Sequence, residues 1–240
     1  MQNAFHIVSA VTDIPLFIIG DHASNHIPSQ YKALGLKGED LTRHIAWDIG
    51  TETIIKTLCT HFGCAGQLAA VSRLVIDLNR EPERDSLIPF ESDGTHIPGN
   101  RNLTPRERNE RLEAFYTPYH DAIDAQLDVM KTPLVLSIHS FTPQVRGQAP
   151  RMVDIGLLVR HDEPTAHKFK TAMEAAYNYD VRMNEPYSAY DLNYTVDHHL
   201  APRCLRHLAI EIRQDHIDTQ DKARRVAMQM AEIIAPLISL

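Results

Sequence analysis

The stretch LFIIGDHASNHIP, residues 16–28, decides the fold. Its apolar run, Leu16 to Gly20, leads directly into Asp21 and His22, which predicts a buried strand followed by a polar loop. Further apolar runs predict further strands, at residues 67–78, 133–138, 153–159 and 207–212. Polar side chains therefore gather where predicted strands end.

Helices are predicted between these strands. Residues 39–61 show helical apolar spacing, so that His44 and Asp48, four residues apart, are expected to share one helix face. Three further helices are expected at residues 105–130, 163–177 and 219–238, and two long loops at 81–104 and 182–202. Strands alternating with helices favour a three-layer α/β sandwich with its ligand crevice at the strand ends.

The composition indicates one compact domain, residues 1–240, because 43% of the residues are hydrophobic and 23% are charged. The net charge of -7 argues against nucleic acid as a partner but not against a small anionic substrate. Three cysteines without a CxxC pair indicate neither a disulfide framework nor a thiolate zinc site. Because Asp13 and Pro15 interrupt the N-terminal apolar residues, we expect no signal peptide or membrane span, and a cytoplasmic location.

Two histidines follow predicted strands. His22 in GDHASNHIP and His139 in LSIHSFTP, residues 136–143, are well placed to offer ring nitrogens to Zn2+ if the strand ends converge. The alternative is a turn of solvated polar residues, or a hydrogen-bonded structural histidine at each position. A site with two histidines needs a third, preferably anionic, ligand, for which Asp48 is the candidate.

The segment SRLVIDLNR, residues 72–80, places Arg73, Asp77, Asn79 and Arg80 around an apolar run that is predicted to be a strand. An arginine here can bind a substrate carboxylate or a developing oxyanion. The alternative is an internal salt bridge, for example between Asp77 and Arg80 or Arg213.

A glutamate lies inside the last predicted strand. Glu211, between two isoleucines in HLAIEIRQD, residues 207–215, is expected to have a raised pKa, as a general base requires. The alternative is an exposed face of an edge strand, or a pair with Arg213. In the late loop, His198 is a candidate substrate contact, although a solvated loop has the same composition.

Six segments, taken in order, resemble the N-formylglutamate amidohydrolase family: GDHASNHIP, HIAWDIG at 44–50, SRLVIDLNR, LSIHSFTP, NEPYS at 184–188 and HLAIEIRQD. This family is similar to a branch of the zinc-carboxypeptidase and aspartoacylase group. The resemblance implies a phosphorylase/hydrolase-like α/β sandwich with a mixed central sheet and one catalytic Zn2+.

The resemblance also implies a metal site. His22 and His139 match the two metal-binding histidines, whereas Asn25 occupies the position of a metal-binding glutamate. Because an asparagine is a poor zinc ligand, either Asp48 supplies the carboxylate or metal binding is weaker than in the wider group. Asp21 is a further candidate for the third ligand.

The remaining matches imply roles in catalysis. Asn79 and Arg80 correspond to residues that bind the substrate's carboxylate, Arg73 to the arginine that faces the oxyanion, and Glu211 to the glutamate that activates water. The expected reaction is hydrolysis of N-formyl-L-glutamate to formate and glutamate. The alternatives are a deacylase for another N-acyl amino acid and a module that binds a small carboxylate without hydrolysing it.

Overall fold

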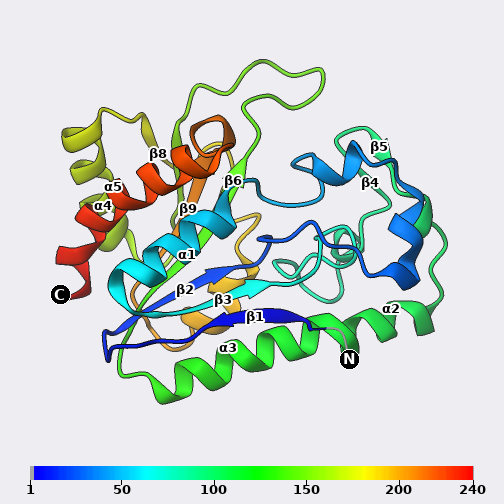
Figure 1. The fold of residues 1–240 in the computed structure, drawn as a ribbon, viewed down its shortest axis with the longest axis horizontal. Helices are drawn as coiled ribbons and strands as arrows, with labels where there is room; N and C mark the ends of the chain where they lie inside the picture. The colour runs from blue at the N-terminus through cyan, green and yellow to red at the C-terminus, as the bar shows by residue number, and fades with distance from the viewer. Residues whose placement is uncertain (1–2, 240) are drawn as a thin grey trace.

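The computed structural model describes residues 3–239 and is built on a seven-stranded sheet with the strand order β1-β3-β2-β6-β9-β7-β8 (Figure 1). The strands are β1 (Phe5–Val8), β2 (Leu16–Gly20), β3 (Ala65–Ala69), β6 (Leu134–Phe141), β7 (Ile155–Leu158), β8 (Val181–Met183) and β9 (His207–Arg213). Of these, β1 and β8 have no counterpart among the predicted strands.

The four central strands, β3, β2, β6 and β9, run parallel to one another. The sheet is nevertheless mixed, because β1 is antiparallel to β3 and β7 is antiparallel to β9. The predicted α/β fold with a mixed sheet is therefore confirmed. Since the central strands are parallel, their carboxyl ends meet at one edge of the sheet, where polar segments follow them.

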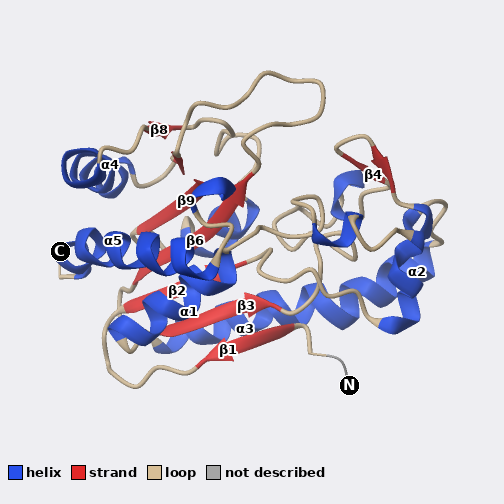
Figure 2. Ribbon diagram, turned by 45° about the horizontal axis from the view of Figure 1, so that its top comes forward, coloured by secondary structure: helices blue, strands red, loops and turns tan. Residues whose placement is uncertain are grey.

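Helices cover both faces of the sheet (Figures 1 and 2). In β2, Leu16 and Ile18 pack into one core layer, and Phe17 and Ile19 into the other. One layer contains α1 (Thr51–Phe62), α4 (Glu163–Tyr177) and α5 (Gln220–Ile238), and the other contains α2 (Pro105–Arg111) and α3 (Thr117–Val129). The predicted three-layer arrangement is confirmed.

The helix starts predicted at residues 105, 163 and 219 agree with the structure to within one residue, and the long loop at 81–104 also appears. Thr104 and Glu107 form a capping box at the start of α2, and a π-helical turn, Leu112–Tyr116, joins α2 to α3. The segment 81–104 holds only short elements: β4 (Glu91–Ser92), β5 (Thr95–His96) and the 3-10 turns Asp85–Leu87 and Pro98–Asn100. Within residues 3–239, every helix falls short of the length or apolarity that a membrane crossing requires.

The predicted helix over 39–61 is wrong in its first half, because α1 begins only at Thr51. Residues 40–42 form a single 3-10 turn, and the Arg43 guanidinium then donates to Asp93 at 2.7 Å and to Thr95 at 2.7 Å. These bonds to the β4–β5 hairpin hold the chain away from a helical path. His44 and Asp48 therefore lie in a loop and share no helix face.

The segment 72–80 is buried but forms no strand, so that prediction is also wrong. Its backbone groups find other partners, as buried polar groups must. The Asp77 N–H donates to the Leu87 carbonyl at 2.7 Å, the Asn100 amide donates to the Leu74 carbonyl at 2.8 Å, and the Arg111 guanidinium donates to the Val75 carbonyl at 2.8 Å. The apolar composition of this segment therefore indicates burial but not a strand. Hydrogen bonds from side chains take the place of the backbone hydrogen bonds that a neighbouring strand would supply.

We predict that Asn100→Ala destabilises the protein by about 2–4 kcal/mol, because it leaves the Leu74 carbonyl, the Pro89 carbonyl and an Arg111 N–H without their buried partner. Urea unfolding measures the loss. The control is Asn109→Ala on the exposed face of α2, which is expected to stay within about 0.5 kcal/mol of the wild type. Equal effects of the two substitutions would contradict this assignment.

Candidate active site

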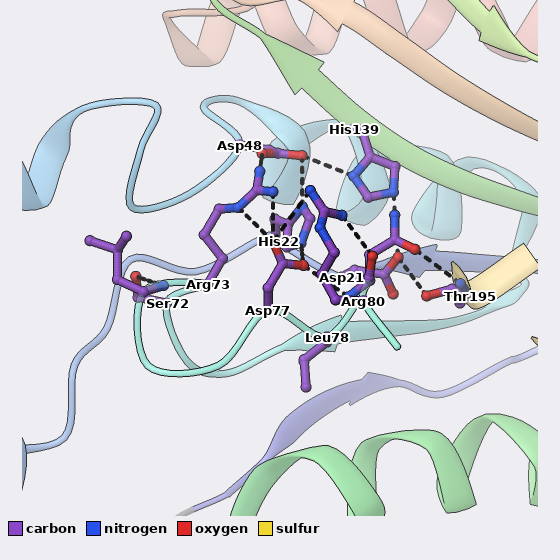
Figure 3. A network of polar contacts seen from close by, with 12 residues as sticks. Asp21, His22, Asp48, Ser72, Arg73, Asp77, Leu78, Arg80, His139 and Thr195 are labelled. Atoms are coloured by element: carbon purple, nitrogen blue, oxygen red, sulfur yellow. Dashed lines mark hydrogen bonds and ion pairs between the residues drawn. The ribbon is translucent and has the colours of Figure 1, made fainter. Parts of the chain in front are cut away.

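Two histidines and one aspartate meet at the carboxyl edge of the sheet (Figure 3). His22 lies just past the end of β2, and His139 lies within the neighbouring strand β6. The Asp48 Oδ2 atom is 2.9 Å from His139 Nδ1 and 3.4 Å from His22 Nδ1. One ligand atom from each residue lies within 4.8 Å of the others, so the three side chains can hold a metal ion.

The second nitrogen of each imidazole ring is also held. His22 Nε2 lies 2.7 Å from Asp77 Oδ1, and His139 Nε2 lies 3.0 Å from Ser137 Oγ and 3.4 Å from Asp21 Oδ2. Such partners fix the ring orientation of metal-binding histidines. Burial lowers the pKa of both imidazoles, but the surrounding carboxylates outweigh it and raise each pKa above its usual value.

Asp48 is placed by the turn that precedes α1. Its N–H donates to the His22 carbonyl at 2.9 Å, and the Thr51 hydroxyl donates to the Asp48 carbonyl at 2.8 Å. Gly50 has φ 86°, and a Cβ atom there would lie 2.3 Å from the Ile217 carbonyl oxygen. The turn therefore requires glycine, and it fixes Asp48 beside the loop that carries His22.

Arg73 is engaged in the internal salt bridge that the sequence left open. Its Nη2 lies 2.7 Å from Asp77 Oδ2, and its Nη1 lies 3.2 Å from Asp48 Oδ1. Arg80 is only a distant partner of Asp77 at 3.9 Å, and Arg213 pairs with other aspartates instead. Burial alone would raise the pKa of Asp77, but Arg73, Arg80 and His22 hold it well below its usual range.

Asn79 and Arg80 follow Asp77 directly in the chain. The Asp77 carboxylate accepts from the Asn79 N–H at 3.0 Å, and the Asn79 side-chain oxygen accepts from the Thr195 N–H at 2.9 Å. Arg80 donates to the Asn79 carbonyl at 2.7 Å. These bonds join the two buried loops around the site and hold both side chains at its wall.

Glu211 lies opposite His139 in the pairing of β6 with β9. It is buried, and within residues 3–239 its carboxylate has no hydrogen-bond or ion-pair partner. Burial, the largest influence, raises its pKa to about 7. The alternative pairing with Arg213 is excluded, because that guanidinium binds Asp154 and Asp215.

A small cavity of about 130 Å³ opens onto these groups. Its polar lining includes most of the predicted site residues and additional residues that were not predicted. The lining consists of His22, His44, Asp48, Arg73, Asn79, Arg80, His139, Ser140, Phe141, Thr142, Tyr187, Leu192 and Glu211.

Two candidates lie elsewhere. His198 is exposed and does not line the cavity, because the π-helical turn Val196–Leu200 directs it outward to a separate group with Asp124 and His199. The geometry therefore gives no support to a substrate contact by His198. Asn25 donates to the Leu41 carbonyl at 2.9 Å and is absent from the His22 group.

The sequence reasoning undervalued Asp21 and Asp77. Asp21 accepts from the Tyr119 hydroxyl at 2.7 Å and from the Thr195 hydroxyl at 3.0 Å while it faces His139. Both aspartates are buried and anchor the two histidines. Their only sequence signal is an acidic residue at the polar end of an apolar run.

The charges of the group suit a divalent cation. Four carboxylates, Asp21, Asp48, Asp77 and Glu211, lie around the two histidines together with the guanidinium groups of Arg73 and Arg80. With neutral imidazoles and ionised carboxylates, two negative charges remain, which one dication would balance. Two imidazole nitrogens and one carboxylate form a donor set typical of catalytic zinc.

A mixed α/β sheet with buried histidines and carboxylates at its edge is the architecture of an α/β enzyme. A model of the N-formylglutamate amidohydrolase family matches residues 14–217. The chain therefore belongs to the N-formylglutamate amidohydrolase family, and amide hydrolysis is its activity at the level of that family.

Two crystal structures are similar along nearly the whole chain. A gene product from Agrobacterium tumefaciens is 34% identical, with a TM-score of 0.91 over 98% of this chain and 94% of that one. The N-formylglutamate amidohydrolase from Ralstonia eutropha is 19% identical, with a TM-score of 0.79 over 98% of this chain and 97% of that one, a likeness of fold. A search of curated proteins finds no match.

We predict that Asp77→Asn lowers stability at pH 7 by about 1–3 kcal/mol, because it removes the nearer of the two aspartates that pair with Arg73 and leaves only Asp48. Since the folded-state pKa of Asp77 is depressed, its contribution is present above the unfolded pKa of about 3.9 and is lost as the pH falls further. Urea unfolding between pH 7 and pH 3 is therefore expected to show a smaller acid-induced loss in the variant. Parallel stability curves for the two proteins would contradict this role.

Proposed function

We propose that this protein is a zinc-dependent hydrolase that cleaves the N-formyl amide of N-formyl-L-glutamate. The observation that carries the proposal is the convergence of His22 Nδ1, His139 Nδ1 and Asp48 Oδ2, with the unpaired carboxylate of Glu211 beside His139. Membership of the amidohydrolase family supports the reaction class.

His22, His139 and Asp48 would hold the zinc ion. When bound, zinc would supply Lewis-acid activation of the water and of the amide carbonyl. Asp77 would keep the His22 ring in position through its Nε2 atom, and Ser137 and Asp21 would do the same for the Nε2 atom of His139. Arg73, bonded to the other oxygen of Asp48, would keep that carboxylate turned toward the histidines.

Glu211 would move the proton. A carboxyl group with a pKa of about 7 exchanges protons readily near neutral pH. Glu211 would accept a proton from the attacking water and pass it to the amide nitrogen as the carbon–nitrogen bond breaks. The water oxygen then remains in formate, and the amine leaves as glutamate.

Arginines and an amide would bind the substrate. Asn79 and Arg80 line the cavity and would bind the α-carboxylate. Arg73 uses three of its five N–H groups on Asp48 and Asp77, so two remain for the amide carbonyl oxygen as charge builds there.

Another N-acyl amino acid as substrate would use the same groups, so the identity of the acyl group rests on the family. A binding module is less well supported, because Asn79 and Arg80 alone would hold a carboxylate and Glu211 would then have no role. A cytoplasmic location and a lack of nucleic-acid partners remain predictions.

The test is formate release from N-formyl-L-glutamate. We expect release by zinc-loaded protein and none after chelation. Glu211→Gln is expected to lower kcat by about 100-fold or more while zinc content is kept, because the proton acceptor is lost but the donor set is not. Glu110→Gln, an exposed change on α2, is the control and is expected to leave kcat unchanged.

Three results would contradict the proposal. Undiminished formate release by the chelated protein would exclude a role for the metal in the reaction. Undiminished kcat in Glu211→Gln would exclude Glu211 as the base. Zinc binding and tight binding of N-formyl-L-glutamate without any formate would favour the binding module.

A further inference from the structure

Arg151 is a cation beside the cavity that no carboxylate among residues 3–239 neutralises. Its Nη1 donates to the Thr142 carbonyl at 3.2 Å and to the Tyr187 hydroxyl at 3.0 Å. Its guanidinium carbon lies 4.8 Å from the centre of the Tyr187 ring and 5.6 Å from that of Phe141. Phe141, Thr142 and Tyr187 all line the cavity, so Arg151 packs directly against its wall.

The donors of Arg151 are only partly used. Within residues 3–239, no carboxylate lies within ion-pair distance of it, whereas Arg73 and Arg213 each have two aspartate partners. Both bonds of its guanidinium come from Nη1. The three N–H groups on Nε and Nη2 therefore have no acceptor in this part of the chain.

Tyr187 offers a further donor at the same place. Its oxygen accepts from Arg151, which leaves its own hydrogen free for a ligand. Burial, followed by the nearby Glu211 carboxylate, raises the pKa of Tyr187, so the phenol stays protonated. Burial lowers the pKa of His44, on the cavity wall, and Arg43, Arg73 and Arg151 lower it further against the opposing effect of Asp93.

We propose that Arg151 and Tyr187 bind the side-chain carboxylate of the substrate, and so select N-acyl derivatives of acidic amino acids over neutral ones. The inference rests on the proposed function, in which Asn79 and Arg80 bind the α-carboxylate. A second carboxylate supplies the anion that Arg151 lacks in the protein, through charge-assisted hydrogen bonds. Phe141 and Leu192, which also line the cavity, suit the methylene groups between the two carboxylates.

A purely structural role for Arg151 makes a different prediction. Stacking on the rings of Phe141 and Tyr187 would stabilise the loop through cation–π attraction and would affect all substrates equally. Discrimination between an acidic substrate and its neutral isostere separates the two roles.

The experiment compares kcat/KM for N-formyl-L-glutamate and N-formyl-L-glutamine in wild type and Arg151→Met. We expect the wild type to prefer the acidic substrate, and the variant to lose about 10- to 100-fold of that preference through KM. The glutamine derivative is expected to change little. Arg146→Met, an exposed change in the same loop, is the control and is expected to keep the wild-type ratio.

Calorimetric binding of L-glutamate and L-glutamine to the zinc-loaded proteins gives a second readout that needs no turnover. If formate is released and Arg151→Met leaves the substrate ratio and the binding preference unchanged, this inference is wrong and the proposed function stands. If no formate is released but the preference for glutamate binding depends on Arg151, the inference stands and the proposed hydrolysis is wrong. If neither formate release nor a preference for glutamate is found, both are wrong.

Discussion

The Asp48 carboxylate is the contact on which the site depends. One of its oxygens faces the Nδ1 atoms of His22 and His139, and the other accepts from Arg73. Four segments far apart in the sequence thus meet on one buried group: the end of β2, the turn before α1, the segment 72–80 and the second half of β6. Because a buried carboxylate is costly without partners, these segments must keep their mutual positions for the fold to be stable.

The buried segment 72–80 extends this arrangement to other residues that line the cavity. Asp77 binds His22, Arg73 and the Asn79 backbone at once, so the orientation of a histidine is coupled to the position of the residues that we propose bind the substrate carboxylate. Asn100 and Arg111 in turn bind the carbonyls of this segment. Asn100 and Arg111 take no part in the proposed chemistry, but they help to fix the geometry of the site.

Local patterns predicted the elements that local forces build. The capping box at Thr104, the apolar run of β2 and the spacing of α4 were read correctly because each is a property of neighbouring residues. The helix predicted over 39–61 is wrong in its first half, and the strand prediction over 67–78 is wrong beyond β3, because tertiary bonds to a distant hairpin and to Asn100 replace the regular backbone pattern. Arg151 carried no sequence signal, since the absence of a carboxylate near it among residues 3–239 is recognisable only in three dimensions.

The most direct test of this account is anomalous diffraction from zinc-loaded crystals. We expect one strong zinc peak per chain, coordinated by Nδ1 of His22, Nδ1 of His139 and an Asp48 oxygen, with Asp77 still bonded to the second nitrogen of His22. A peak at the exposed group of Asp124, His198 and His199 alone, or zinc at His22 and His139 with Asp48 turned away, would contradict it.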